Sequence, residues 1–325
     1  MTRRDEQDEL QEGIVIRAGS GSCRVAVGDE LYRCRLRGRL KHGRRETQAV
    51  VVAGDRVRVR PLPPESEAAE ATAVVEEVLP RDSAITRRAS RRTGGHRAQV
   101  LMANLGQLVV VQSVAEPAPQ GSLVDRLLVG AEGEGVQAAL CLNKCDLAPT
   151  VAADPRWEYY AGLGVQVLRT SVVSGEGLAA LSALLRDRVS LLLGASGVGK
   201  SSLLNAIEPG LALRTGEVTE RTGLGRHTTT HTELFPLSGG GFIADSPGLR
   251  GFEAWDVAPV SLRDCFPDFA GPAADCRYRS CLHREEPGCG VKEAVARGTL
   301  PAWRHAAYLD ILRDLEERRR EVQGW

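Results

Sequence analysis

A glycine-rich run, Gly194-Ala195-Ser196-Gly197-Val198-Gly199-Lys200-Ser201 followed by Ser202, has the residue types of a phosphate-binding loop. Strand-like VSLLL precedes it and helix-like SLLNAI follows, which is the context this motif requires. Its backbone N–H groups can surround a β-phosphate, and the N-terminus of the following helix favours an anion. Lys200 would bridge the β- and γ-phosphate oxygens during catalysis, and Ser201 would bind Mg²⁺. A plain glycine turn is the alternative, which the complete pattern argues against.

A second short motif, Asn143-Lys144-Cys145-Asp146, follows the strand-like run AALCL and could read a purine base. Guanine offers its ring N–H and its amino group to one carboxylate, here Asp146, whereas adenine presents an acceptor at the ring position. Lys144 can lie along the base plane, and Asn143 can tie the loop to neighbouring segments. Ser171, in RTSVVSGEGL, is suited to support this loop. Four residues are weak evidence alone, but together with the phosphate loop they favour a guanine nucleotide.

A third motif, Asp245-Ser-Pro-Gly248, follows the strand-like run GGFIA. Asp245 would hold Mg²⁺ through water, and the Gly248 N–H would sense the γ-phosphate. The preceding segment TGEVTERTGLGRHTTTH is poor in apolar residues, so we expect it to be mobile. One threonine in it would close over Mg²⁺; the candidates are Thr228, Thr229 and Thr230, and Thr229 is preferred.

The residue after Gly248 is Leu249, where small GTPases often have a glutamine that orients the attacking water. A leucine cannot form that hydrogen bond, so we expect slow intrinsic hydrolysis that a partner accelerates. His227 and His231 are the nearest replacements in the sequence. For His231, a solvated loop histidine is the favoured interpretation.

A cluster of metal-ligand residues follows these motifs. Cys276, Cys281, His283 and Cys289 supply three thiols and one imidazole within 14 residues. This set is typical of one closed, tetrahedral, structural zinc site, although a reduced cysteine-rich loop is the alternative. Cys265 lies outside the compact spacing and is expected to be buried without a metal.

The segments that would carry these residues differ in their patterns, and the sequence therefore predicts a multidomain chain. Short strands and glycine turns predict an antiparallel oligonucleotide-binding (OB-fold) barrel over residues 1–80, and residues 81–97 form a basic, flexible linker. Strand–helix alternation over 98–251 predicts a parallel α/β P-loop GTPase domain. Residues 252–325 form a small α-helical zinc-binding domain that ends in a charged helix near Ala302–Arg320.

Charge and composition limit the function. Lys+Arg and Asp+Glu both number 42, so there is no global basic field. Basic residues crowd Arg33 to Arg60, either as a solvated strand face or as an RNA-binding stripe. The N-terminus lacks the apolar run of a signal peptide and no segment could span a membrane, so we expect a cytoplasmic chain with reduced cysteines. Four scattered cysteines are expected to be small core or surface residues: Cys23, Cys34, Cys141 and Cys145.

The base-reading motif precedes the phosphate loop, which reverses the usual order in GTPases. The chain resembles the circularly permuted, small-ribosomal-subunit-dependent GTPases of the RsgA (YjeQ) family through VAGDRVRV, NKCDL, GASGVGKSSLLN, GRHTTTH, DSPGL and CRYRSCLHREEPGCGVKEAV. The resemblance implies a late assembly factor of the small (30S) subunit that binds 16S rRNA and GTP or GDP, with subunit-stimulated hydrolysis, and it favours His227 over His231. Cofactors would be one structural Zn²⁺ and Mg²⁺ with GTP.

Two other functions fit the same residues: an RNA-binding scaffold that holds GTP with little turnover, or a permuted GTPase that acts on another RNA. No membrane partner is expected, and a monomer is the default expectation. Because Gly248 lies only a few residues before the zinc-binding domain, the motif order also predicts that nucleotide state repositions that domain.

Overall fold

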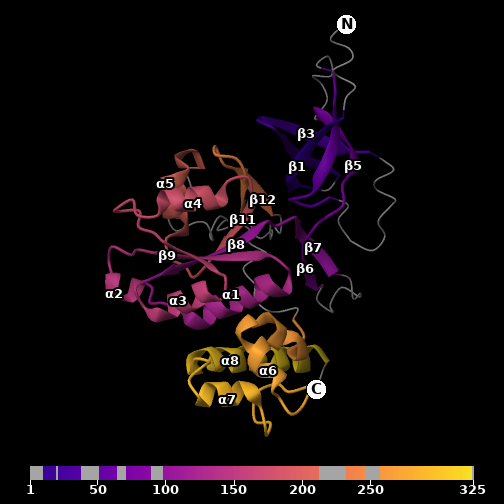
Figure 1. Cartoon of the computed structure of the whole chain (residues 1–325). Helices are drawn as coiled ribbons and strands as arrows, with labels where there is room; N and C mark the ends of the chain where they lie inside the picture. The colour runs from indigo at the N-terminus through magenta and orange to yellow at the C-terminus, as the bar shows by residue number, and fades with distance from the viewer. Residues whose placement is uncertain are drawn as a thin grey trace. The chain divides into compact units, whose positions relative to one another are not determined.

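The computed structural model describes residues 10–19, 21–37, 51–63, 71–88, 98–211, 232–245 and 257–323 (Figure 1). The chain divides into two compact units. Unit 1 contains residues 1–107, 182–192 and 204–250, and unit 2 contains residues 108–181, 193–203 and 251–325. The four predicted domain ranges stay a prediction.

Five strands at the start of unit 1 form a closed barrel: β1 Gln11–Ala18, β2 Ser22–Val27, β3 Glu30–Leu36, β4 Arg56–Pro61 and β5 Ala73–Val78. Their hydrogen-bonded order is β1-β2-β3-β5-β4, and β4 pairs back with β1. Alternate side chains point inward and form a core of small apolar residues, among them Val15, Val25, Cys34, Val57 and Val75. This confirms the predicted barrel.

One detail of the prediction for this region is wrong: the barrel is not wholly antiparallel, because β3 and β5 pair in parallel. Within the range predicted as a linker, 81–97, Ala84–Arg88 form the strand β6, which pairs antiparallel with β7 (Ala98–Ala103). Arg81 bonds both carboxylate oxygens of the fully buried Asp55, at 2.6 and 2.8 Å. Residues 89–97 lie outside the described residues.

Unit 1 also contains three strands from later in the chain: β11 Val189–Leu193, β12 Glu233–Pro236 and β13 Phe242–Asp245. β11 pairs parallel with β13, as expected of a P-loop domain. β12 pairs antiparallel with β13 and also with β1 of the barrel, where Arg17 faces Glu233. The sequence did not predict β12, because only four residues form it.

The first part of unit 2 contains β8 Gln107–Ser113, β9 Gln137–Asn143 and β10 Gln166–Arg169, in the order β10-β9-β8. Every residue of β8 is buried, which explains its nearly continuous apolar sequence. Unit 2 also contains the helices α1 Gly121–Gly133, α2 Pro149–Ala152 and α3 Pro155–Gly162. Helices α4 Leu178–Leu185 and α5 Lys200–Ile207 begin in residues of unit 2 and end in residues of unit 1, to which the short 3-10 helix η4 Pro209–Leu211 also belongs. These strands had been predicted from their apolar runs, and α1 and α5 from helix-like segments.

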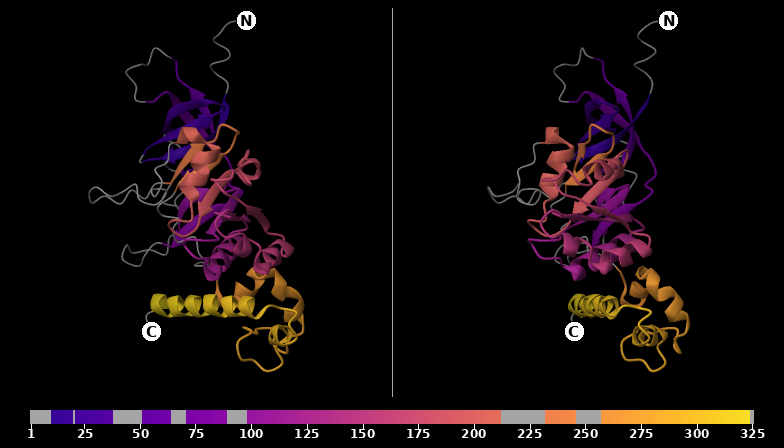
Figure 2. Two further views of the ribbon diagram at one scale, coloured as in Figure 1. Left: turned by 90° about the vertical axis from the view of Figure 1, so that its left-hand side faces the viewer. Right: turned by 60° about the vertical axis from the view of Figure 1, so that its left-hand side comes forward.

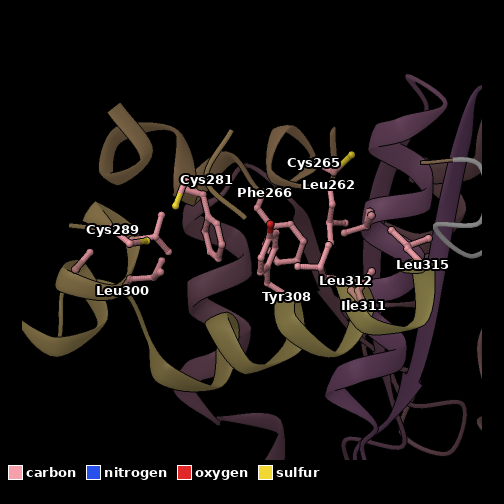
Figure 3. Close-up of a cluster of buried hydrophobic side chains, with 14 residues drawn as sticks. Leu262, Cys265, Phe266, Cys281, Cys289, Leu300, Tyr308, Ile311, Leu312 and Leu315 are labelled. Atoms are coloured by element: carbon pink, nitrogen blue, oxygen red, sulfur yellow. The ribbon is translucent and has the colours of Figure 1, made fainter. Parts of the chain in front are cut away.

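The C-terminal part of unit 2 is helical and irregular, and below it is called the C-terminal module (residues 257–323). Its elements are η6 Pro259–Cys265, η7 Pro267–Phe269, α6 Ala270–Ala274, α7 Gly290–Ala296 and α8 Ala302–Gln323. The long α8, yellow in Figure 2, confirms the predicted terminal helix. Figure 3 shows the core, in which Phe266, Tyr308 and Leu312 pack beside two of the clustered cysteines. Among the described helices, none has the length and apolar character needed to cross a bilayer.

Candidate nucleotide site and metal centre

The predicted base-reading loop begins at the end of β9 and is bonded to the phosphate loop. The Asn143 side chain is buried, and its amide nitrogen donates to the Val198 carbonyl at 2.9 Å. Its amide oxygen lies 3.2 Å from the hydroxyl of Thr170, at the end of β10. The same hydroxyl is 3.2 Å from the Leu142 carbonyl. Because both ends of the amide have partners, its orientation is fixed and the two loops are joined.

Lys144 makes a second connection between the loops. It adopts a left-handed backbone conformation, with φ of 64°, which turns its side chain away from the strand direction. Its ammonium donates to the Gly197 carbonyl at 2.9 Å and also to the Glu116 carbonyl. The two motifs, separated by about 50 residues in sequence, therefore form one site in unit 2.

Of the other predicted base-reading residues, two are buried and one is exposed. Cys145 is buried, and its backbone N–H donates to the Thr170 carbonyl at 3.2 Å. Ser171 is fully buried and its hydroxyl accepts from Ser174 N–H, so it supports its own turn. Asp146 is exposed, and the next side chain, Leu147, is 64% exposed. A carboxylate and an apolar side chain are thus open to a planar base.

The phosphate loop follows β11 and requires glycine where other backbone comes close. A Cβ on Gly194 would lie 2.0 Å from the Val111 carbonyl oxygen. A Cβ on Gly199, whose φ is +99°, would lie 2.3 Å from the Asn143 amide nitrogen. No larger residue can keep this close contact between the loops.

Lys200 begins helix α5, and its side chain folds back over the loop. Its ammonium donates to the carbonyls of Gly194 and Ala195 at 2.8 and 2.9 Å. Burial lowers the pKa of Lys200 from its usual value. Ser201 is also buried, and Ser202 is half-buried. A bound phosphate would offer the ammonium charged oxygens in place of carbonyls and so favour its charged form.

The remaining predicted nucleotide residues lie elsewhere. Asp245 is half-buried at the end of β13 in unit 1. The other candidates lie outside the described residues: His227, Thr228, Thr229, Thr230, His231, Gly248 and Leu249.

Two supporting residues were missed in the sequence. Thr170 orients Asn143, and the only sequence signal for it is a hydroxyl residue directly before Ser171. Glu116 contributes its backbone carbonyl to Lys144, and a backbone acceptor leaves no signal in residue type.

The four predicted metal ligands of the C-terminal module converge. The ligand atoms of Cys276, Cys281, His283 and Cys289 all lie within 4.8 Å of one another. His283 Nδ1 is 3.5 Å from the sulfurs of Cys276 and Cys289, which are 4.0 Å apart. A tetrahedron with Zn–S bonds of about 2.3 Å has S···S edges of about 3.8 Å, close to these separations.

The chemistry of the cluster also fits a cation. Burial raises the pKa of Cys281 to about 12 and lowers that of His283, so without a cation the uncharged forms are favoured. His283 Nε2 is buried and has no hydrogen-bond partner among the described residues, while Nδ1 faces the sulfurs. A neutral imidazole that presents Nδ1 is a zinc ligand. Cys265 is buried outside the cluster, and its sulfur contacts the Ser261 carbonyl at 3.9 Å. The four other cysteines are buried as well: Cys23, Cys34, Cys141 and Cys145.

In sequence order the chain has a five-stranded barrel, then the base-reading loop, then the phosphate loop, and the two loops are bonded to each other. This order defines a circularly permuted P-loop GTPase. Comparisons with known proteins agree. The RsgA GTPase family model matches residues 78–255, and the RsgA N-terminal domain model matches residues 12–67. The chain therefore belongs to the RsgA family of GTPases and is a GTP hydrolase.

Individual relatives cover nearly the whole chain. The protein named small ribosomal subunit biogenesis GTPase RsgA from Gemmatimonas aurantiaca is 38% identical over 304 residues, which are 93% of this chain and 97% of the relative. The protein of the same name from Moorella thermoacetica is 38% identical over 95% of this chain and 99% of its own. The crystal structure of YjeQ from Thermotoga maritima matches with a TM-score of 0.73 and 30% identity, over 94% of this chain and 99% of that one.

Proposed function

We propose that this chain is a late assembly factor of the small (30S) ribosomal subunit, which binds 16S rRNA and hydrolyses GTP to GDP and phosphate when the subunit stimulates it. The observation that carries the proposal is full-length similarity, at 38% identity, to relatives named for small-subunit biogenesis. Such a role would place the protein in the cytoplasm. A monomer stays the default expectation.

In this proposal the two joined loops bind the nucleotide. Asp146 accepts hydrogen bonds from guanine, Lys144 lies along the base, and the N–H groups of the phosphate loop surround the phosphates. Lys200 neutralises charge on the β- and γ-phosphates. Mg²⁺ would be held by Ser201 and, when GTP is bound, by Thr229. Asp245 would hold Mg²⁺ through water, and the Gly248 N–H would sense the γ-phosphate. The cluster of three cysteines and His283 holds one structural Zn²⁺.

The β2–β3 hairpin of the barrel supports contact with RNA. Arg24 and Arg33 lie directly opposite each other across the hairpin, and Arg35 follows on the same face. All three are exposed, and none forms an ion pair with another described residue. Like charges placed opposite each other destabilise a strand pair, so folding does not account for them. A phosphate backbone would neutralise them.

The arginines of β4, elsewhere in the barrel, differ because they form ion pairs with acidic side chains. Arg56 bonds Asp82, Arg58 bonds Glu12 and Glu77, and Arg60 bonds Glu76. The predicted basic stripe from Arg33 to Arg60 is therefore uneven in the part that the structure describes. Arg24, Arg33 and Arg35 of the hairpin, below called the arginine face, have no ion-pair partner among the described residues and could bind an anion.

The proposal is tested by multiple-turnover GTP hydrolysis with and without purified small subunits. We expect slow hydrolysis alone and a rise of at least tenfold with small subunits, but not with large subunits or tRNA. His227→Ala should lose the stimulated rate and keep GDP affinity, with His231→Ala as the matched control. Equal stimulation by large subunits or tRNA would contradict the small-subunit assignment, and an unchanged rate with every RNA would favour a GTP-binding scaffold.

A further inference from the structure

A buried charged cluster joins the C-terminal module to helices α1 and α3 within unit 2. Its centre is Arg304 of α8, of which only 2% is exposed. The guanidinium donates to Asp125 of α1, and to both carboxylate oxygens of Asp268 of η7 at 3.0 and 3.2 Å. Both aspartate side chains are also nearly inaccessible to solvent. One buried guanidinium thus bonds two buried carboxylates, and the three groups come from three different elements.

Two tyrosines of α3 complete the cluster. The Tyr160 hydroxyl donates to Asp125 and the Tyr159 hydroxyl donates to Asp268, each at 2.8 Å. The Arg304 guanidinium lies 4.2 Å from the centre of the Phe266 ring. Trp303, next to Arg304, packs on the Tyr159 and Tyr160 rings at centroid distances of 5.4 and 5.7 Å. The buried polar side chains of the module and of the two helices therefore form hydrogen bonds with one another.

This arrangement fixes orientation more strongly than an apolar contact would. Apolar side chains can slide over one another, whereas a guanidinium between two carboxylates has one favourable geometry. Burial raises the pKa of Asp125, and Arg304 and the Tyr160 hydroxyl oppose that shift. Removing Arg304 would leave two buried carboxylates without their cation, which is strongly unfavourable. A small rotation of the module would have a similar effect, because it would break these bonds.

The helices involved belong to the part of unit 2 that carries the base-reading residues. α1 leads through a short turn into β9, which ends at Asn143. α3 leads into β10, after which Thr170 contacts Asn143. The peripheral pair Arg126–Asp314, at 2.5 Å, adds a second link between α1 and α8.

We propose that Arg304 is a positioning residue that fixes the C-terminal module on α1 and α3, so that the module and the base-reading part of unit 2 form one rigid body in both the GDP and the GTP states. This goes beyond the proposed function and does not depend on the ribosome. It also differs from the expectation, based on motif order, that nucleotide state repositions the module.

Spin-label distance measurements on the full, zinc-loaded chain test the proposal. Labels go on Ala161→Cys of α3 and on Arg297→Cys, the residue that caps α7; both positions are exposed. The protein without added cysteines measures background labelling. We expect the distance to differ by less than about 2 Å between GDP and a non-hydrolysable GTP analogue, within the range of local side-chain changes.

Variants of the labelled protein test the role of Arg304 itself. Arg304→Met should broaden or shift the distance distribution, and Arg304→Lys, which keeps the charge but not the planar donors, should recover it in part. Arg313→Met is the matched control, because Arg313 lies on the same helix, is exposed and pairs with Asp310 one turn away. It should resemble the parent protein.

Two outcomes would overturn the proposal. One is a nucleotide-dependent shift above about 2 Å in the parent protein, which is the scale of a loop or domain rearrangement. The other is a folded, metal-loaded Arg304→Met with an unchanged distribution. If Arg304→Met fails to fold or to hold metal, the comparison of the two nucleotide states in the parent protein still decides between one rigid body and a moving module.

Discussion

Asp146 is the residue on which the choice of base depends, because it is exposed at the end of a loop whose other members are fixed by hydrogen bonds. We predict that Asp146→Asn weakens GDP binding by about 10²-fold or more, since hydrogen bonds to a charged group are worth roughly 1.5–3 kcal/mol each. Xanthosine diphosphate should gain affinity, because xanthine has a carbonyl that can accept from the new amide. Titration calorimetry with both nucleotides measures the change.

Asp154→Asn is a suitable control for that variant, because Asp154 is an aspartate of the same unit that caps helix α3 by accepting from the Arg156 N–H. It should leave base preference unchanged. If Asp146→Asn bound GDP as tightly as the parent, the carboxylate would not contact the base and the site would have to be reassigned.

Among single residues, the sequence predicted the members of the nucleotide motifs better than the residues that support those motifs. Asn143, Lys144 and the phosphate loop lie together as their motifs required. Thr170 and the Glu116 carbonyl were missed, because a threonine hydroxyl or a backbone oxygen can support a loop from many positions. Ser171 was predicted to support the base-reading loop, and its hydrogen bonds to Ser174, Gly175 and Glu176 lie within its own turn.

Among the elements, the C-terminal module has two of the four clustered ligands, Cys281 and Cys289, inside its buried core, so the packing of that core should depend on metal. We predict that a chelator, or Cys289→Ala, releases one equivalent of zinc and unfolds this module, because metal-binding free energy is folding free energy in such sites. Mass spectrometry gives the metal content, and near-ultraviolet circular dichroism reports the packing around Tyr308 and Phe266.

Cys265→Ala is the matched control, since Cys265 is a buried cysteine of the same core but does not belong to the four-ligand cluster. It should keep the metal and lose only about 1–2 kcal/mol of stability through a small cavity. A module that kept its circular dichroism signal after complete loss of zinc would contradict a structural metal.

Element type was predicted well where the pattern was long, and poorly where it was short or depended on distant partners. The buried strand β8 and the helix α8 followed from their patterns. The four-residue β12 did not, because it is short and pairs with the distant strand β1 as well as with β13. The strand β6 did not, because its sequence lies in a basic stretch with no clear alternation and its order depends on pairing with β7. The parallel pairing of β3 with β5 depends on barrel closure, which no local pattern encodes.

For the whole molecule, equal numbers of basic and acidic residues, 42 each, mean that attraction to RNA must come from a local surface. The arginine face is such a surface, because its three guanidinium groups have no ion-pair partner among the described residues. The arginines of β4 are already paired with carboxylates. We therefore predict that the triple variant Arg24→Ala, Arg33→Ala and Arg35→Ala binds RNA more weakly. Its RNA affinity should also depend less on salt concentration, because phosphate contacts are lost.

Filter binding to 16S rRNA over a range of salt concentrations measures this effect. Each lost phosphate contact should reduce the slope of log affinity against log salt by about 0.7 to 0.9, so the triple variant should lose about 2 to 3 in slope. The matched control replaces Arg56, Arg58 and Arg60 by alanine and removes the same charge from β4, another strand of the barrel. Because those guanidinium groups are already neutralised, its slope should change by less than half as much. Equal losses in the two triple variants would mean that RNA binding depends on net charge and not on the arginine face.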